Sequence, residues 1–213
     1  MLDHTTLGLI CHLADHQVVA GVDEVGRGSW AGPVEVGISV ARVGELRRML
    51  AKPGAFAELN DSKRLSGSAR ERLVGSWPDV FEVRIGSASA TECDQLGMTE
   101  ALRLAGGRAL EHFGQPIDLV LLDGSHNYLR MKNVITVAKG DTMCAPIALA
   151  AVTAKVHRDH VMAELAVALP QWGFERHKGY GSRSHEQALL DHGLSRIHRR
   201  SWGYVSRLGL TPV

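Results

Sequence analysis

Apolar and polar positions along the chain predict an ordered series of strands and helices. Strands are expected where β-branched and other apolar residues cluster between turn residues, in segments 17–25, 32–43, 81–87, 117–122 and 133–138. Helices are expected where the pattern is helical, in segments 44–51, 67–75, 91–112, 145–168 and 183–192. Ser66 and Thr91 are the expected N-caps of two of these helices, and residues 171–182 are expected to form a polar loop.

Strands come first along the chain and then alternate with helices, an order that favours an α/β domain with a mixed sheet. The run from Ile117 to Leu122 is continuously apolar, as is typical of a buried parallel strand. We expect a single domain over residues 1–213, with a core at about 17–170 and a C-terminal segment at about 171–213.

The composition is that of a globular protein, and only the distribution of charge adds to the picture. The 213 residues are 45% hydrophobic and 22% charged, with a net charge of +1. Between Arg176 and Arg207, however, seven Lys or Arg residues stand against two acids. This C-terminal segment is either a solvated surface or a face that binds a polyanion such as nucleic acid, and both interpretations stay open.

The three cysteines, Cys11, Cys93 and Cys144, are scattered and lack metal-site or disulfide-framework spacing. No apolar run approaches the ~20 residues that a membrane helix needs, and we find no signal-peptide pattern. We therefore expect a cytoplasmic protein without a membrane partner. Separately, we expect a monomer.

Four acids stand at or just after predicted strand ends: Asp23, Glu24, Asp123 and Asp141. Asp123 and Asp141, each taken alone, are also ordinary turn or capping residues. If the strand ends converge, the acids repel one another unless cations lie among them. Carboxylate oxygens suit Mg²⁺ or Mn²⁺, and two such ions ~3.5–4 Å apart support phosphoryl transfer. The pattern therefore favours a metal-dependent nuclease or a related phosphoryl-transfer enzyme.

Asp23 and Glu24 are adjacent in a strand, so their side chains point to opposite faces. They can share one metal site only if the strand ends or twists there. The sequence Gly26-Arg27-Gly28 follows at once. Its glycines let the backbone approach a ligand closely, and its arginine adds a cation beside that ligand.

Several motifs in order resemble the type 2 ribonucleases H, specifically bacterial ribonuclease HII. The first is Gly21-Val22-Asp23-Glu24-Val25-Gly26-Arg27-Gly28 followed by Ala31-Gly32-Pro33-Val34. The others are Leu59 to Leu65 with its Asp-Ser-Lys loop, Asp123-Gly124, Lys139-Gly140-Asp141, Ala150 to Asp159, His177 to Ser182 and His198 to Trp202.

The resemblance implies a ribonuclease H-like mixed sheet flanked by helices, with a small helical C-terminal segment that binds substrate. It implies hydrolysis of RNA in RNA–DNA hybrids and incision 5′ of single ribonucleotides in duplex DNA, leaving 5′-phosphomonoesters. The four acids carry over as catalytic ligands of Mg²⁺ or Mn²⁺. Gly26, Arg27 and Gly28 carry over as the loop that recognises the 2′-hydroxyl, and Tyr180 as the residue that stacks on the following deoxyribose.

Other residues depart from the family pattern or leave their roles open. Ser29-Trp30 stands where Pro-Leu is common, Cys93-Asp94 where Ile-Asp is usual, and Trp202 where Phe is typical. Asp159 is a rival to Asp141 for the fourth acid, but it lies inside a predicted helix, where it can simply pair with a basic side chain. The strand-end position and the motif both favour Asp141.

Basic and aromatic residues give three further expectations. Lys63 and Lys155 are candidate phosphate contacts, with solvated or paired lysines as the alternative. Arg199 and Arg200 are expected to grip the DNA backbone. The aromatic residues Trp77, Trp172 and Phe174 are expected to pack rather than to stack on bases.

Other functions remain as rivals. A resolvase, an integrase or a ribonuclease HIII would use the same fold, but ribonuclease HIII usually has an extra N-terminal domain, for which Asp23 comes too early. A non-catalytic hybrid-binding module would not need the acids. A mononucleotide-binding domain would use the glycines at 21–28, but the Rossmann spacing is absent.

Overall fold

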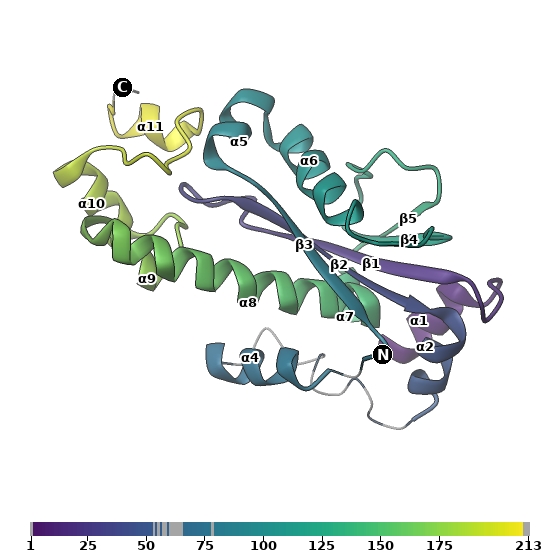
Figure 1. Cartoon of the computed structure of the whole chain (residues 1–213). Coiled ribbons are helices and arrows are strands. Elements are labelled where there is room, and N and C mark those ends of the chain that lie inside the picture. The colour runs from purple at the N-terminus through teal and green to yellow at the C-terminus, as the bar shows by residue number, and fades with distance from the viewer. Residues whose placement is uncertain are drawn as a thin grey trace.

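A five-stranded mixed sheet forms the centre of the molecule, shown as a computed structural model in Figure 1. The structure describes residues 2–52, 54, 56, 59, 66–77 and 79–210. The strand order is β3-β2-β1-β4-β5, and the strands are β1 (Val18–Val25), β2 (Val34–Arg42), β3 (Glu82–Ala88), β4 (Leu119–Asp123) and β5 (Val134–Val137). The pairs β1–β2 and β2–β3 are antiparallel, whereas β1–β4 and β4–β5 are parallel. The predicted mixed sheet and its five strands are confirmed.

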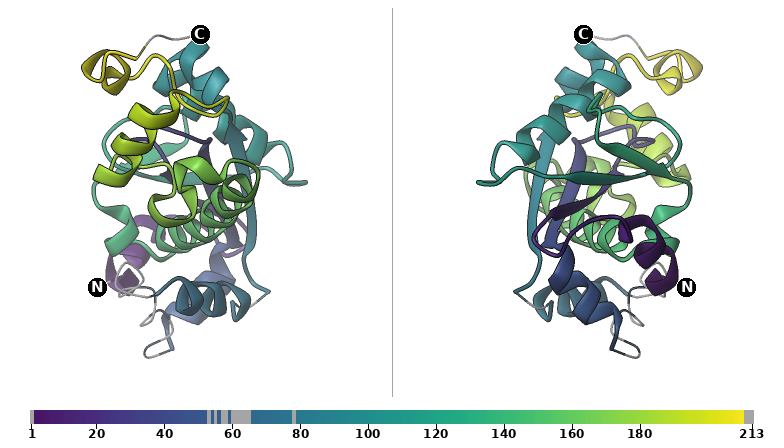
Figure 2. Two further views of the ribbon diagram at one scale, coloured as in Figure 1. Left: turned by 90° about the vertical axis from the view of Figure 1, so that its left-hand side faces the viewer. Right: turned by 90° about the vertical axis from the view of Figure 1, so that its right-hand side faces the viewer.

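Helices cover both faces of this sheet, as Figures 1 and 2 show. The long helix α8 (Ala145–Ala168) packs on one face against β1 and β2, and α6 (Met98–Leu110) packs on the other against β2 and β3. Glycines permit these approaches. A Cβ at Gly21 of β1 would lie 2.1 Å from the backbone carbon of Pro146, and one at Gly86 of β3 would lie 2.0 Å from the Ala105 carbonyl oxygen. Each face therefore carries its own buried apolar core.

The remaining helices gather at the two ends of the sheet. The helices α1 (Leu2–Ile10) and α2 (Val43–Leu50) lie at the end with the N-terminus, and α10 (Arg183–His192) and α11 (Gly203–Arg207) lie at the opposite end (Figure 1). The helix α4 (Gly67–Gly75) packs against α8. Three shorter helical turns are α7 (Gly140–Met143), η2 (Pro170–Trp172) and α9 (Phe174–His177). No helix in the described part of the chain is long and apolar enough to cross a bilayer.

Three sequence-based expectations need correction. The helix expected over 91–112 is two helices, α5 (Ala90–Leu96) and α6, because Gly97 between them has a φ of 74°. The N-cap of α5 is Ser89 rather than Thr91, since Ser89 and Glu92 form a reciprocal capping box. The expected loop at 171–182 contains the helical turns η2 and α9. The Ser66 cap is confirmed, because its Oγ accepts a 3.2 Å hydrogen bond from the Ala69 N–H.

Candidate active site

The carboxyl ends of β1 and β4 bring three of the predicted acids together. The strands are parallel, with Val22 opposite Leu122, so Asp23 and Asp123 stand side by side at the same edge. Asp123 Oδ1 accepts a 2.6 Å hydrogen bond from the Gly140 N–H. Gly140 begins α7, whose next residue is Asp141. One hydrogen bond thus ties the end of β4 to the turn that carries the fourth acid.

Asp23 and Glu24 border the same cavity although strand geometry directs neighbouring side chains to opposite faces. The strand ends at Val25, directly after this pair, so the condition set by the sequence for a shared site is met. The cavity has a volume of about 270 Å³ and is lined by Asp23, Glu24, Val25, Arg70, Asp141, Ala151, Val152 and Lys155.

The acids interact strongly with one another. Burial raises the pKa of Asp23 well above its usual value, and the nearby charges of Asp123, Glu24 and Asp141 raise it further. Burial also raises the pKa of Glu24, and Arg27 opposes this rise through an ion pair of 3.2 Å. Asp23 thus experiences the negative charge of all three other acids, which disfavours its ionised form unless a cation compensates it.

The donor chemistry fits a hard divalent cation. All four side chains offer carboxylate oxygens, the donors that Mg²⁺ and Mn²⁺ prefer. Within the described ranges, no three Asp, Glu, His or Cys side chains converge closely enough to enclose a metal ion. The acids are nevertheless close enough for their charges to raise the pKa of Asp23, and a common ion would have to draw their carboxylates closer together than they stand here.

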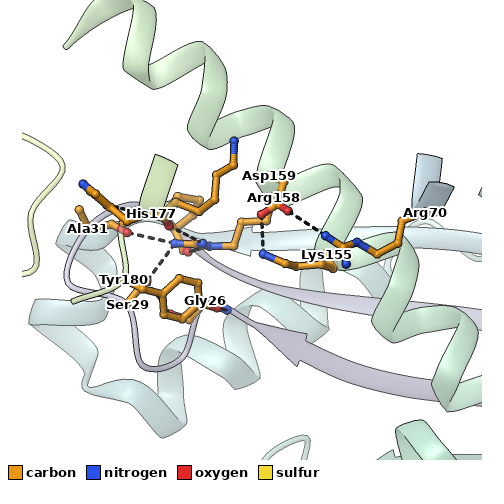
Figure 3. Close-up of polar contacts among 12 residues, drawn as sticks. Gly26, Ser29, Ala31, Arg70, Lys155, Arg158, Asp159, His177 and Tyr180 are labelled. Carbon is orange, nitrogen blue, oxygen red and sulfur yellow. Dashed lines mark hydrogen bonds and ion pairs between the residues drawn. The ribbon is translucent and has the colours of Figure 1, made fainter. Parts of the chain in front are cut away.

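Asp159 pairs with basic side chains, as one of its two interpretations predicted. Its carboxylate lies 2.6 Å from Lys155 Nζ and 3.9 Å from Arg70 Nη2 (Figure 3). These pairs place Lys155 and Arg70, both of which line the cavity, beside the acids. Lys63, the other predicted phosphate contact, lies outside the described residues.

The predicted Gly-Arg-Gly loop and the predicted tyrosine meet next to the acids. The Gly26 N–H donates a 3.1 Å hydrogen bond to Tyr180 Oη (Figure 3). Gly26 is buried and has a φ of 83°, a conformation that favours glycine. Arg27 and Gly28 are exposed at the tip of the same loop. The half-buried Tyr180 ring and two exposed loop residues therefore share one surface.

Two arginines, Arg158 and Arg199, are fully buried. The sequence analysis assigned no role to the first and predicted a DNA contact for the second. Arg199 is 0% exposed and donates to the carbonyl oxygens of Gly32 and Arg27 at 3.0–3.2 Å. The expectation that it grips DNA is wrong, because no part of it reaches solvent. Arg158 is also 0% exposed, and sequence reasoning gave it no role. Its only signal was its place in the motif from Ala150 to Asp159.

The aromatic residues that were expected to pack do so. Phe174 is fully buried, and Trp172 stacks beside it with ring centroids 6.4 Å apart. Trp77 packs against Phe56 in the core next to α8. Trp30, which departs from the family pattern, stacks on Tyr204 at a centroid distance of 4.6 Å. This contact fixes the C-terminal α11 beside the Gly-Arg-Gly loop.

Comparisons with known proteins identify the family. The family model described as Ribonuclease HII matches residues 20–205. Similar curated proteins include ribonuclease HII of Streptomyces avermitilis, with 46% identity over 90% of this chain and 79% of that protein. Ribonuclease HII of Rhodospirillum rubrum is 44% identical over 88% and 84%, and one from Thermus thermophilus is 39% identical over 91% and 90%.

Solved structures share the fold. Ribonuclease H2 of Pyrococcus horikoshii superposes with a TM-score of 0.73 at 24% identity, over 90% of this chain and 97% of that one. A ribonuclease HIII solved in complex with Mn²⁺ gives a TM-score of 0.69 at 15% identity, over 94% and 71%. With the family match over most of its length, the chain belongs to the ribonuclease HII family of ribonucleases H, enzymes that hydrolyse the RNA strand of RNA–DNA hybrids.

Proposed function

We propose that this ribonuclease H also incises duplex DNA on the 5′ side of a single embedded ribonucleotide. The observation that carries the proposal is the hydrogen bond between the Gly26 N–H and Tyr180 Oη. Gly26 lies in the loop only two residues after Glu24, and the bond joins this loop to the aromatic side chain of Tyr180. An enzyme that cuts at one ribonucleotide must read a 2′-hydroxyl and the sugar that follows it, and this pair of features suits both tasks.

We call Gly26, Arg27, Gly28 and Tyr180 the proposed sensor, and its geometry supports a separate role for each part. Gly28 is exposed and its Cβ position is open, so main-chain groups there can approach a 2′-hydroxyl closely. The Arg27 side chain is 59% exposed and pairs with Glu24, which places a cation between the loop and the acids. The half-buried Tyr180 ring would stack on a deoxyribose, where an added 2′-hydroxyl would alter the packing.

The chemistry we propose uses Mg²⁺ or Mn²⁺, with two ions in the active complex. Asp23, Glu24, Asp123 and Asp141 would hold them. Ions bound there would activate a water and would stabilise the leaving oxygen. Burial of Asp23 among other acids makes its carboxylate a strong ligand, because a bound cation removes the repulsion that raises its pKa. The hydrogen bond from Gly140 keeps Asp123 facing the same edge as Asp23.

The C-terminal segment supplies the proposed duplex contacts. Arg176, Arg183 and Arg196 are exposed on it, whereas Arg199 is not. Contacts from such side chains to phosphates add affinity that falls as salt rises and carry little sequence preference. This division assigns duplex binding to the segment and ribonucleotide recognition to the loop and tyrosine.

The deciding experiment compares two substrates with Mg²⁺ or Mn²⁺: a duplex DNA with one ribonucleotide and an all-RNA strand on DNA. We expect incision of both, with cleavage 5′ of the lone ribonucleotide. Asp123→Asn is expected to abolish both reactions without unfolding the protein. Cleavage of the all-RNA hybrid alone, or full activity of Asp123→Asn, would refute the proposal.

A further inference from the structure

Arg158 joins two loops that are distant in sequence. Here the junction loop is residues 26–33 and the tyrosine loop is residues 177–182. The buried guanidinium donates to the Pro33 carbonyl at 2.9 Å, to Ser29 Oγ at 2.9 Å and to the Ala31 carbonyl at 3.0 Å. Its remaining bond, 2.9 Å long, goes to the Lys178 carbonyl in the tyrosine loop (Figure 3). One side chain on α8 therefore holds both loops.

This guanidinium is buried without a carboxylate partner among the residues that the structure describes. Its four bonds go to three carbonyls and one hydroxyl. A buried charge of this kind costs more free energy than apolar packing of similar volume. The planar guanidinium instead holds several acceptors in a fixed geometry at the same time, which the ammonium group of a lysine cannot do.

Arg158 packs closely against both loops. A Cβ at Gly26 would lie 2.3 Å from Arg158 Nε, and the Arg158 Cζ is 5.4 Å from the centre of the Tyr180 ring. The loops also touch directly, since the N–H groups of Trp30 and Ala31 donate to the Gly179 carbonyl at 2.8 Å and 3.2 Å. Displacement of Arg158 would therefore change the positions of both loops and of the Tyr180 ring.

We propose that Arg158 is a positioning residue that couples the junction loop to the tyrosine loop and so sets the enzyme's preference for a ribonucleotide followed by a deoxyribonucleotide. The inference rests on the proposed function. Among the described residues, the hydrogen bonds of Arg158 go neither to the four acids nor to the exposed loop tip at Arg27 and Gly28, so it acts through Gly26 and Tyr180. Its loss should affect recognition of the single ribonucleotide far more than hydrolysis of a continuous RNA strand.

The test is a double-mutant cycle with Arg158→Lys and Tyr180→Ala, measured as kcat/KM on both substrates. Arg158→Lys alone should lower kcat/KM on the single-ribonucleotide duplex by about 10- to 100-fold, as expected for a misplaced recognition group. On the all-RNA hybrid the loss should stay within about threefold. In the Tyr180→Ala background, Arg158→Lys should cause little further loss on either substrate, because the group through which it acts is gone.

Arg199→Lys is the matched control. It alters another fully buried guanidinium that bonds to the junction loop, but no bond of Arg199 reaches the tyrosine loop among the described residues. Its effect should therefore be equal in the wild-type and Tyr180→Ala backgrounds. If Arg158→Lys fails to fold, Ser29→Ala replaces it in the cycle, because Ser29 Oγ both accepts from Arg158 and donates to the Gly26 carbonyl.

The outcomes separate this inference from the proposed function. Losses that multiply in the double variant, or equal losses on both substrates, refute the coupling while leaving the proposed function intact. A wild-type enzyme that does not incise the single-ribonucleotide duplex refutes both. The coupling is supported if the wild type incises the single-ribonucleotide duplex and if the losses in kcat/KM of the two single variants do not multiply in the double variant.

Discussion

Gly26 and Tyr180 are joined by a 3.1 Å hydrogen bond from backbone N–H to phenol oxygen, although 154 positions separate them. Both partners of this bond belong to the protein, so it fixes the two parts of the proposed sensor relative to each other. Preorganisation of this kind lowers the entropic cost of binding. It also requires glycine at position 26, where the φ is 83° and a Cβ would clash with Arg158.

Two substitutions at Tyr180 separate the ring from its hydroxyl. Tyr180→Ala removes both and should lower kcat/KM on the single-ribonucleotide duplex by roughly 100-fold, while the protein stays folded. Tyr180→Phe keeps the ring but leaves the Gly26 N–H without its acceptor, which should cost about 1–3 kcal/mol in stability. Steady-state kinetics and thermal melting of both variants give the comparison. Wild-type kinetics for Tyr180→Ala would contradict the stacking role.

Asp23→Asn should stabilise the metal-free protein while removing activity. Burial and the nearby acids raise the pKa of Asp23, so its charge is unfavourable in the folded state without a cation. The neutral amide removes this repulsion, and Tm should rise by ~2–4 °C for each kcal/mol gained. The increase in Tm that Mg²⁺ gives the wild type should shrink, because a ligand is lost. Calorimetry with and without Mg²⁺ measures both effects.

Asp159→Asn is the opposite-sign control for this experiment. Asp159 accepts the 2.6 Å bond from Lys155 and lies near Arg70, so its charge is compensated by cations. Its neutralisation should lower the Tm of the metal-free protein and leave the Mg²⁺-dependent increase in place. A lower metal-free Tm for Asp23→Asn as well would show that the acids do not repel one another.

A chain of hydrogen bonds runs from Ser195 through His198 and His185 to the Tyr180 carbonyl, and it can form only when both histidines are neutral. The Ser195 N–H donates to His198 Nδ1 at 2.8 Å, so that nitrogen carries no proton. His198 Nε2 lies 3.0 Å from His185 Nε2, and His185 Nδ1 lies 2.9 Å from the Tyr180 carbonyl. Because a carbonyl only accepts, His185 carries its proton on Nδ1 and takes one bond from His198. One extra proton anywhere in the chain would set two donors against each other.

Stability should therefore fall in mild acid. Burial, together with nearby His177, lowers the pKa of His185 to about 4, and burial beside His185, His177 and Arg200 lowers that of His198 to about 3. The unfolded state takes up these protons near pH 6.5, so it binds more protons than the folded state below that pH. Each group should reduce the free energy of unfolding by up to about 1.4 kcal/mol per pH unit between pH 6.5 and its folded pKa.

Urea unfolding from pH 7.5 to pH 4.5 measures this slope. His198→Gln should flatten it, because one proton-uptake site of the unfolded chain is removed. His112→Gln, at an exposed position, should leave the slope as in the wild type. An equal slope in all three proteins would assign the acid sensitivity to other groups.

Gly21 should tolerate no side chain. A Cβ there would lie 2.1–2.4 Å from backbone atoms of Pro146 and Ile147, where α8 crosses β1. Gly21→Ala should therefore separate these elements and cost about 3 kcal/mol or more, at the upper end of overpacking penalties. Gly8→Ala is the control, since Gly8 is exposed in α1 and nothing lies near its Cβ position. It should raise stability by about 0.5–1 kcal/mol. Chemical denaturation of both variants tests the contrast.

Local patterns in the sequence were sufficient for the sheet and for the longest helix. The bounds of α8 agree with the expected 145–168, because Pro146 near its start and Pro170 after its end limit it locally. The helix α1 was missed, since distant residues hold it: Ile10 is buried in the core beside α8, and Thr6 Oγ accepts from the Ala145 N–H. Packing partners far along the chain leave no local periodic signal.

The candidate site divides in the same way. The sequence by itself determined that acids stand at strand ends, because a strand's apolar run and the acid after it are neighbours in the chain. Only the tertiary structure decided that Asp23 lies among the other acids. It also decided that Arg158 and Arg199 are internal supports rather than DNA contacts. Most of their acceptors are carbonyl oxygens, which every residue has, and for Arg158 the carbonyl acceptors in the junction loop lie 125 and 127 positions away. The sequence shows that an arginine can donate hydrogen bonds. Burial and the folded backbone decide which groups accept them.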